Sequence, residues 1–196
     1  KELPYIPILT NARHCQIECT PNEVLTILSN LNTSKAIGPD KIHNIILKKC
    51  ALTLSLPLSM LFNSSLNLGK FPKKWKEAFV TALFKKENRE LPNNYRPISL
   101  LSCISKVLER IIYNKLYKYL IDNNLLNHCN SGFKEFDSTI NRLLALTHQI
   151  YNGLDNRHDI LLTFLDISKA FDRVWHKGLI HKLTKIGIGG PLRSEE

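Results

Sequence analysis

The sequence ILLTFLDISKAFDRVW, residues 160–175, gives the first indication of the fold. Its first six residues form an apolar run interrupted only by Thr163, which is typical of a β-strand buried on both faces. Asp166 follows this run, and the end of such a strand is a common place for a functional side chain in open α/β sheets. Asp is also a favoured N-cap residue. From this stretch alone, Asp166 is either a ligand-binding carboxylate or the cap of the next helix.

The charge of the chain favours an anionic partner. Its 196 residues carry 27 lysines and arginines against 17 acidic residues, which gives a formal net charge of +10. Nucleic acid is the first candidate for the partner, with membrane headgroups or simple solubility as alternatives. The length suffices for one large domain or two small ones, with a core that needs no disulfide bonds.

The cysteines and the apolar runs predict an intracellular protein, nuclear or cytoplasmic. Five cysteines are an odd number without framework spacing, which is typical of reduced thiols. The first residues show no signal-peptide pattern. No apolar run approaches the ~20 residues that a membrane-spanning helix requires, so we expect no membrane partner.

Capping signals and breaks predict the elements of the first half. Thr20, Pro21 and Glu23 form a strong helix start with a capping box. Residues 42–68 indicate two helices, with Pro57 bending or starting the second. A strand is expected next, followed by a turn-rich connection; these occupy residues 78–84 and 91–97.

The second half is expected to be mainly helical before and after the opening stretch. Ser102 can cap a long amphipathic helix that runs to about Asp122, and Ser138 or Thr139 starts another. A last helix is expected over residues 176–186. The helix after Ser138 is expected to turn its apolar side chains inward: Ile140, Leu143, Leu144, Leu146, Thr147 and Ile150.

Basic residues gather around the predicted strand at residues 78–84. Between Lys70 and Arg89 there are seven lysines and arginines and two acids. A strand with a basic tip can clamp phosphates, while a solvated loop is the alternative. The turn at residues 38–40, flanked by Lys35 and Lys41, leaves the same two interpretations open.

Four short segments then carry a resemblance. They are SKAIGPD at 34–40, NYRPISLL at 94–101, GF followed by ST at 132–139, and FLDISKAFDRVWH at 164–176. In this order and spacing they resemble the reverse transcriptases of non-LTR retrotransposons, and the jockey-like elements of animals in particular. The last segment is similar to motif A of these polymerases. The resemblance covers about residues 20–190.

The resemblance implies an α/β (α+β) right-hand polymerase with RNA template, DNA primer and dNTP as partners. Residues 1–19 would be an extended segment. Residues 20–159 would be the fingers, largely helical with a basic strand or hairpin. Residues 160–196 would be the first part of the palm, so that the chain is the N-terminal part of an RNA-directed DNA polymerase, a nucleotidyltransferase.

The resemblance also implies the catalytic residues. Asp166 would be the catalytic metal ligand and the carbonyl of Ile167 a second contact, for Mg²⁺ prefers such oxygen ligands. Two Mg²⁺ ions in the complete enzyme would stabilise the attacking and leaving oxygens. Phe171 matches the bulky position beneath the sugar, which excludes a ribose 2′-hydroxyl. Asp172 is expected at the start of the next helix.

Nucleotide and template contacts follow from the same match. Arg96 and Lys85, or else Lys86, would hold the triphosphate, Arg bidentately and Lys as a point charge. The implied template and primer contacts are Lys35, Gly132, Phe133 and Lys134.

Several positions depart from the family pattern. Lys134 stands where arginine is usual, which keeps the charge but loses the planar fork. Asp137 stands where a basic residue is common, which weakens a template contact there. Ile37 replaces a proline and Lys41 a glycine.

The family's Y/F-A-D-D motif has no counterpart, because no Asp-Asp pair occurs in the sequence. We therefore expect these residues alone to lack polymerase activity, as a portion of a larger enzyme or a decayed transposon copy. A non-catalytic RNA- or DNA-binding remnant, or domesticated module, is one alternative. An unrelated metal-dependent phosphotransferase is another, and it requires further carboxylates around Asp166.

Overall fold

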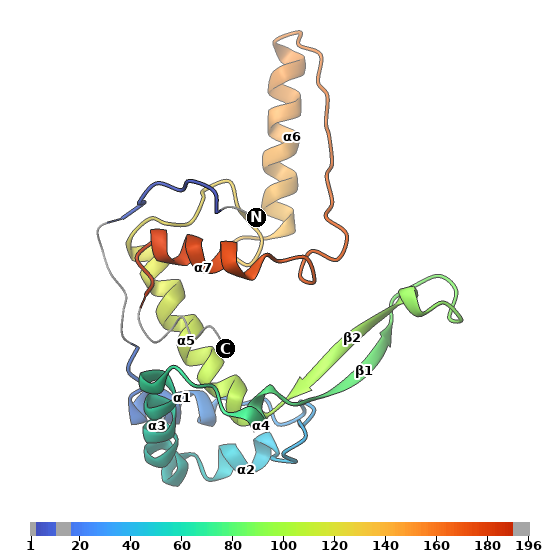
Figure 1. Ribbon diagram of the computed structural model, residues 1–196. Helices are drawn as coiled ribbons and strands as arrows, with labels where there is room; N and C mark the ends of the chain where they lie inside the picture. Colours follow the sequence, from blue (N-terminus) through green and yellow to red (C-terminus); the bar gives the residue numbers. More distant parts are fainter. Residues whose placement is uncertain (1–2, 11–16, 190–196) are drawn as a thin grey trace.

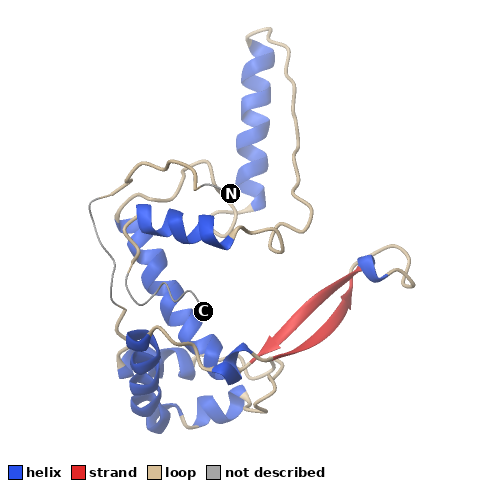
Figure 2. Ribbon diagram, viewed as in Figure 1, coloured by secondary structure: helices blue, strands red, loops and turns tan. Residues whose placement is uncertain are grey.

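The computed structural model describes residues 3–10 and 17–189 and shows helices with one small sheet. Parts of the segments 1–19 and 160–196 therefore lie outside the described residues. Figures 1 and 2 show a helical body, a projecting hairpin and a separate long helix. The elements are α1 (Pro21–Ser29), α2 (Asn44–Lys49), α3 (Ala51–Leu68), α4 (Lys73–Lys76), β1 (Ala78–Phe84), a 3₁₀ turn η1 (Pro92–Asn94), β2 (Tyr95–Leu101), α5 (Cys103–Asp122), α6 (Thr139–Asp155) and α7 (His176–Lys185).

The helical body, which we define as residues 17–19 with α1, α2, α3, α4 and α5, holds the core. Val24 and Leu28 of α1 are completely buried, as is Phe62 of α3. The predicted capping box fixes the start of α1, because the Thr20 hydroxyl accepts from the Glu23 amide and the Glu23 carboxylate accepts from the Thr20 amide. This helix start is confirmed.

Asn63 of α3 ties the chain before α1 to the body. Its side-chain oxygen accepts from the Cys19 amide at 2.7 Å, and its side-chain nitrogen donates to the Cys19 carbonyl at 3.0 Å. A neighbouring β-strand would bond the N–H and C=O groups of Cys19 in the same way. The Asn63 side chain thus satisfies both backbone groups of a residue that is buried in the core. Burial raises the pKa of the Cys19 thiol to about 11.

Residues 42–68 form two helices as predicted, but Pro57 does not start the second one. The break falls at Cys50, and Pro57 lies inside α3. Proline removes one helical hydrogen bond. The helix nevertheless continues, because Leu58 and Phe62 beyond the proline are buried in the core and anchor the second half.

β1 and β2 form an antiparallel hairpin that leaves the body between α4 and α5 (Figure 1). Ala78 pairs with Leu101 at its base, and Phe84 pairs with Tyr95 near its tip. The predicted strand at 78–84 is confirmed. The prediction of a turn-rich connection is wrong for residues 95–97, which belong to β2. Pro97 is tolerated because both strands of a two-stranded sheet are edge strands.

The predicted buried strand at the start of residues 160–175 is wrong. The segment runs back beside α6 without forming a strand (Figure 1), and Leu161 and Leu165 are 89% and 91% exposed. A strand needs a neighbour for its backbone N–H and C=O groups. β1 and β2 are the strands in the described part of the chain, and they pair with each other. This segment therefore has no sheet to join.

α6 starts after its cap Ser138, as predicted, but its inward face is wrong. None of its residues is buried, and Leu143 and Leu144 are 57% and 64% exposed. The helix stands away from the helical body (Figure 2). Its apolar side chains consequently have no other element of the described chain to cover them.

α7 returns to the body and confirms the helix expected at 176–186. The Tyr119 hydroxyl of α5 donates to the Ile186 carbonyl at 2.8 Å, and the Leu9 amide donates to the Lys185 carbonyl at 3.1 Å. Ile188 is 3% exposed. Across the described ranges, no helix has both the length and the apolar character that crossing a bilayer demands.

Candidate nucleic-acid and nucleotide interface

The turn at residues 38–40 packs directly against the start of α5. A Cβ atom on Gly38 would lie 2.5 Å from the Leu101 carbonyl carbon and 2.6 Å from the Ser102 nitrogen. The Ser102 hydroxyl donates to Asp40 at 2.5 Å and accepts from the Ile104 amide at 3.2 Å. This contact joins the SKAIGPD and NYRPISLL segments, and it requires glycine because no side chain fits at position 38.

A basic groove lies beside this contact. We use this name for a cavity of about 450 Å³ between α1, β2 and α5. Lys35, Lys106 and Arg110 supply its positive charge, and no acidic side chain lines it. Its apolar lining consists of Ile27, Leu31, Ala36, Ile98, Leu100 and Cys103. Three cations around one cavity are a charge arrangement that suits phosphate groups.

Lys35 was predicted as a contact, but the sequence reasoning missed Lys106 and Arg110 as members of a site. The expected helix from Ser102 to about Asp122 contains both residues, but nothing in the sequence assigns them to a site. Their i, i+4 spacing places them on one helix stripe. That stripe becomes part of a site only because the turn at 38–40 brings Lys35 to the same cavity.

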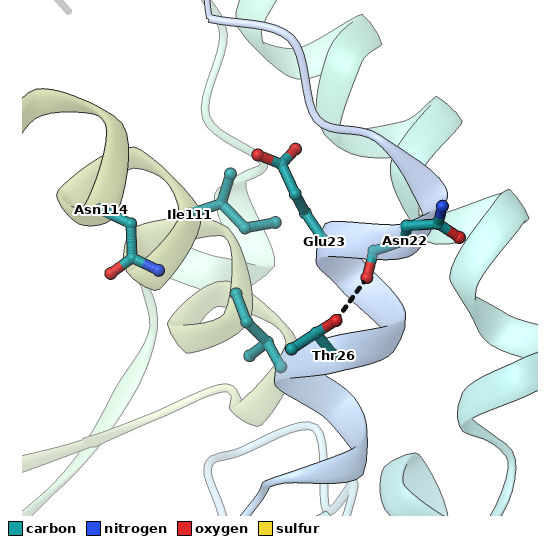
Figure 3. Close-up of a pocket in the computed structure, with 6 residues that line it drawn as sticks. Asn22, Glu23, Thr26, Ile111 and Asn114 are labelled. Carbon is teal, nitrogen blue, oxygen red and sulfur yellow. Dashed lines mark hydrogen bonds between the residues drawn. The ribbon is translucent and has the colours of Figure 1, made fainter. Parts of the chain in front are cut away.

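The charge is balanced further along α1 and α5. Asn22, Glu23, Thr26 and Ile27 of α1 face Ile111 and Asn114 of α5 around a smaller cavity of about 270 Å³ (Figure 3). Lys115 pairs with Glu23 at 2.7 Å. Burial alone would raise the pKa of Glu23, but its bonds to Lys115 and Thr20 outweigh burial and lower it. The excess positive charge therefore lies at the Lys35 end.

The hairpin places Lys85 and Arg96 on one face. The Lys85 amide donates to the Asn94 carbonyl at 2.8 Å, which continues the ladder one pair beyond Phe84 and Tyr95. Arg96 lies opposite Leu83. Because strand side chains alternate, Lys85 and Arg96 share a face and are diagonal neighbours. Both are exposed.

Aromatic contacts fix the tip of the hairpin. The Arg89 guanidinium lies 5.0 Å from the centre of the Phe84 ring, and Phe84 meets Tyr95 edge to face at 5.5 Å. The Tyr95 hydroxyl donates to the Arg89 carbonyl at 2.8 Å. These contacts order the connection that follows Lys85. Lys85 and Arg96, the residues predicted to hold the triphosphate, therefore lie next to an ordered hairpin tip.

The loop at residues 131–138 meets the far end of α5. The Glu135 amide donates to the Tyr117 hydroxyl at 3.0 Å, and the Lys134 amide donates to the Ser131 carbonyl at 3.2 Å. The predicted contacts Gly132, Phe133 and Lys134 thus lie together, separate from the Lys35 cavity. Phe133 is 92% exposed and has a φ of 62°, a strained value for a bulky residue.

Asp137 is engaged within its own loop. It accepts from the Ser138 amide at 2.8 Å and lies 3.4 Å from the Arg142 guanidinium. Hydrogen bonds from Ser131 and Ser138, followed by the charge of Arg142, lower the pKa of Asp137. The acid at this unusual position therefore stabilises the start of α6.

Asp166, Ile167 and Phe171 lie in an exposed stretch without regular secondary structure. Ile167 is 68% and Phe171 83% exposed. The expectation for Asp172 is wrong, because α7 begins at His176 after Trp175. Figure 1 shows this stretch apart from the hairpin, so the structure does not bring Asp166 to Lys85 and Arg96.

The metal ligands of the described chain are incomplete. A carboxylate and a carbonyl are the oxygen donors that Mg²⁺ prefers. However, the described residues contain no group of three His, Cys, Asp or Glu side chains able to hold a metal ion. These residues alone do not fit two ions. The same finding argues against an unrelated phosphotransferase, which requires carboxylates converging on Asp166.

Comparison with known proteins agrees with the resemblance. The family model "Reverse transcriptase (RNA-dependent DNA polymerase)" matches residues 84–194. A probable RNA-directed DNA polymerase from transposon BS of Drosophila melanogaster is 36% identical over 165 residues, which are 84% of this chain and 18% of that protein. The RNA-directed DNA polymerase from mobile element jockey of the same fly is 32% identical over 168 residues, 85% of this chain and 18% of that protein.

The chain thus spans about one fifth of the length of these relatives. The family model covers more than half of the chain, including the hairpin tip, β2, α5, α6 and the stretch around Asp166. The chain therefore belongs to the reverse transcriptase (RNA-dependent DNA polymerase) family, with relatives among the jockey-like and other non-LTR retrotransposons.

Proposed function

We propose that this chain is the fingers and the beginning of the palm of an RNA-directed DNA polymerase of a non-LTR retrotransposon. The fingers are residues 20–159, preceded by the extended segment 1–19, and the palm begins at residues 160–196. The complete protein copies an RNA template into DNA from a DNA primer and dNTPs. Its intracellular site of action, nuclear or cytoplasmic, is part of the same proposal.

The observation that carries this proposal is the shared face of the hairpin. Lys85 directly follows β1 and Arg96 lies in β2, and the register makes them diagonal neighbours on one exposed face. A guanidinium beside an ammonium suits the triphosphate of an incoming nucleotide, because the first binds two oxygens and the second acts as a point charge. We assign Lys85 and Arg96 to nucleotide binding, and Phe171 to the sugar.

The template and primer contacts that we propose lie at both ends of α5. Lys35 lines the basic groove near the start of α5, and the loop with Gly132, Phe133 and Lys134 meets Tyr117 near its end. A strand of nucleic acid contacts several of these sites at once if it follows the helix. The net charge of +10 supports an anionic partner.

Asp166 and the Ile167 carbonyl are the proposed metal ligands of this part of the enzyme. Reverse transcriptases use divalent metal ions, and Mg²⁺ is the ion that we propose. When bound, two such ions stabilise the attacking and leaving oxygens of nucleotide transfer. The described residues supply Asp166 without converging acids. We therefore propose that these 196 residues alone do not extend a primer.

A non-catalytic nucleic-acid-binding module is the second candidate. The basic groove is a formed cavity with three cations, whereas Asp166 lies in an exposed stretch. In this alternative, the chain binds RNA or DNA but has lost the ability to support nucleotide transfer. Both candidates predict that the chain binds RNA, and they differ in whether its Asp166 can support nucleotide transfer in a longer protein.

A pair of assays on the 196-residue chain tests the proposal. The first measures binding of a labelled single-stranded RNA at several salt concentrations, and the second measures extension of a DNA primer on an RNA template. We expect salt-dependent binding without extension. Absence of RNA binding at low salt would contradict both candidates, and extension by this chain would contradict the proposed inactivity.

A further inference from the structure

A single stripe of α5 connects the basic groove with the loop at residues 131–138. Lys106, Arg110, Tyr113 and Tyr117 follow one another at spacings of four, three and four residues, which places them on one side of the helix. We call these four residues the α5 stripe. Its first two members line the basic groove. Its last member accepts the hydrogen bond from the Glu135 amide.

The members of the α5 stripe also contact one another. The Arg110 guanidinium lies 5.6 Å from the centre of the Tyr113 ring. The rings of Tyr113 and Tyr117 are stacked at 5.5 Å with an interplanar angle of 16°. Tyr113 therefore stands between a cation and a second ring, and it holds Arg110 in place through a cation–π contact. Arg110 itself is exposed, and Tyr113 is 40% exposed.

The hairpin continues the same surface. Ile98 and Leu100 line the basic groove, and they lie on the face of β2 that carries Arg96. The face of β2 that carries Arg96 therefore leads into the basic groove, where Lys106 and Arg110 begin the α5 stripe. Cations lie beside apolar and aromatic side chains on this surface.

We propose that the α5 stripe is a binding track for a single strand of nucleic acid, and that Tyr113 is a positioning residue for Arg110. Lys106 and Arg110, with Lys35, contact successive phosphates. The exposed edges of the two tyrosines contact sugars or bases, which an unpaired strand offers more freely than a duplex. This inference rests on the proposed function, which gives RNA as the template, and it adds the residues that guide the strand.

The balance of charge favours this occupant. The basic groove has no acidic lining. Glu109 precedes Arg110 on α5 and is not among the residues that line the groove. An anionic strand therefore meets cations first at Lys106 and Arg110. The neighbouring Lys115 is already paired with Glu23 and is not part of the track.

Binding of a labelled 12-nucleotide uridine RNA by the whole chain tests the track. We compare the variant Lys106→Gln/Arg110→Gln with the charge-matched variant Lys49→Gln/Lys177→Gln, which removes two exposed lysines on α2 and α7. The stripe variant is expected to lose about tenfold or more in affinity at ~0.1 M salt. Its slope of log affinity against log salt should fall by ~1.4, at ~0.7 for each phosphate contact on a single strand. The matched variant should lose less than about twofold in affinity.

Tyr113 is tested by a double-mutant cycle. Tyr113→Leu should lower the affinity for RNA about threefold to tenfold, a range that fits one lost aromatic or cation–π contact. Tyr113→Phe should restore it, because the ring is kept. In the Arg110→Gln background, Tyr113→Leu should have little further effect, since the two residues act together. Equal loss in both backgrounds would contradict the positioning role.

The outcomes separate this inference from the proposed function. If the unmodified chain binds no RNA, the proposed function fails. If it binds RNA but the two charge variants lose the same affinity, only the net charge matters and the track is wrong. A matched duplex RNA that competes as well as the single strand would also contradict the track. A DNA strand of the same sequence shows whether the track distinguishes the sugar. Equal circular dichroism spectra establish that every variant is folded.

Discussion

The helical body and the segment from α6 to Trp175 differ in what covers their apolar residues. We call residues 139–175 the apolar arm. In the body, Val24 and Phe62 are completely buried. In the arm, Leu144 is 64% and Phe164 83% exposed. Both regions have the apolar patterns of buried elements. The difference shows that an apolar sequence pattern predicts which face of an element is apolar. It does not predict whether another element of the described chain packs on that face.

The largest expected effect is the loss of a large side chain from the body. Phe62→Ala should lower the free energy of unfolding by about 3–5 kcal/mol, because the side chain is fully buried and meets Trp75 edge to face at 5.9 Å. Leu144→Ala in the arm should cost less than about 0.5 kcal/mol. Urea unfolding followed by circular dichroism measures both. Similar costs for the two variants would contradict the comparison.

A smaller effect is expected at the contact between the turn at 38–40 and α5. Gly38→Ala should cost about 1–3 kcal/mol of unfolding free energy, because its Cβ would meet the backbone of Leu101 and Ser102. Gly132→Ala is the matched control, since the nearest atom to its Cβ is 3.9 Å away. It should cost much less. If both substitutions are harmless, the close approach of this turn to α5 is wrong.

The next effect depends on pH. Glu23→Gln should cost about 1 kcal/mol at pH 7, because it weakens the capping box and the bond to Lys115. The pKa of Glu23 is lowered in the folded chain, so its contribution is present above the unfolded value near 4.5 and is lost as the pH falls through the folded value. The difference between the variant and the unmodified chain should therefore shrink at acid pH.

An exposed ion pair provides the comparison for Glu23. Glu87 lies 3.6 Å from Lys86, and both side chains are about two-thirds exposed. Glu87→Gln should change the free energy of unfolding by less than about 0.5 kcal/mol at any pH. A pH dependence of Glu87→Gln as large as that of Glu23→Gln would show that the cap and the partial burial of Glu23 are unimportant.

Local signals predicted the elements whose partners are close in sequence. The capping box at Thr20, the caps Ser102 and Ser138, and the strand at 78–84 are all confirmed. Each of these signals depends on hydrogen bonds or side-chain alternation within a few residues. The sequence does not predict the break at Cys50, because α3 continues past Pro57 through Leu58 and Phe62, which are buried in a core built from residues distant in sequence.

Predictions were less successful for residues whose environment depends on segments far away in the sequence. The apolar run before Asp166 indicates a buried strand, but a strand also needs a sheet to join. Lys106 and Arg110 could be assigned only to an outer helix face, because no local signal shows that Lys35 shares their cavity. The roles of Asp166, Lys85, Arg96 and Phe171 remain proposals, which the family membership supports.

A chimaeric enzyme tests the central claim most directly. In it, this chain replaces the matching segment of the jockey polymerase, and primer extension on an RNA template is measured. We predict that the chimaera extends the primer, that Asp166→Asn abolishes extension, and that Asp172→Asn retains it. Binding of RNA should be unchanged in both variants. Extension by the Asp166→Asn chimaera at the unmodified rate would contradict the assignment of Asp166 as a catalytic metal ligand. A folded, RNA-binding chimaera that never extends the primer would favour the non-catalytic module.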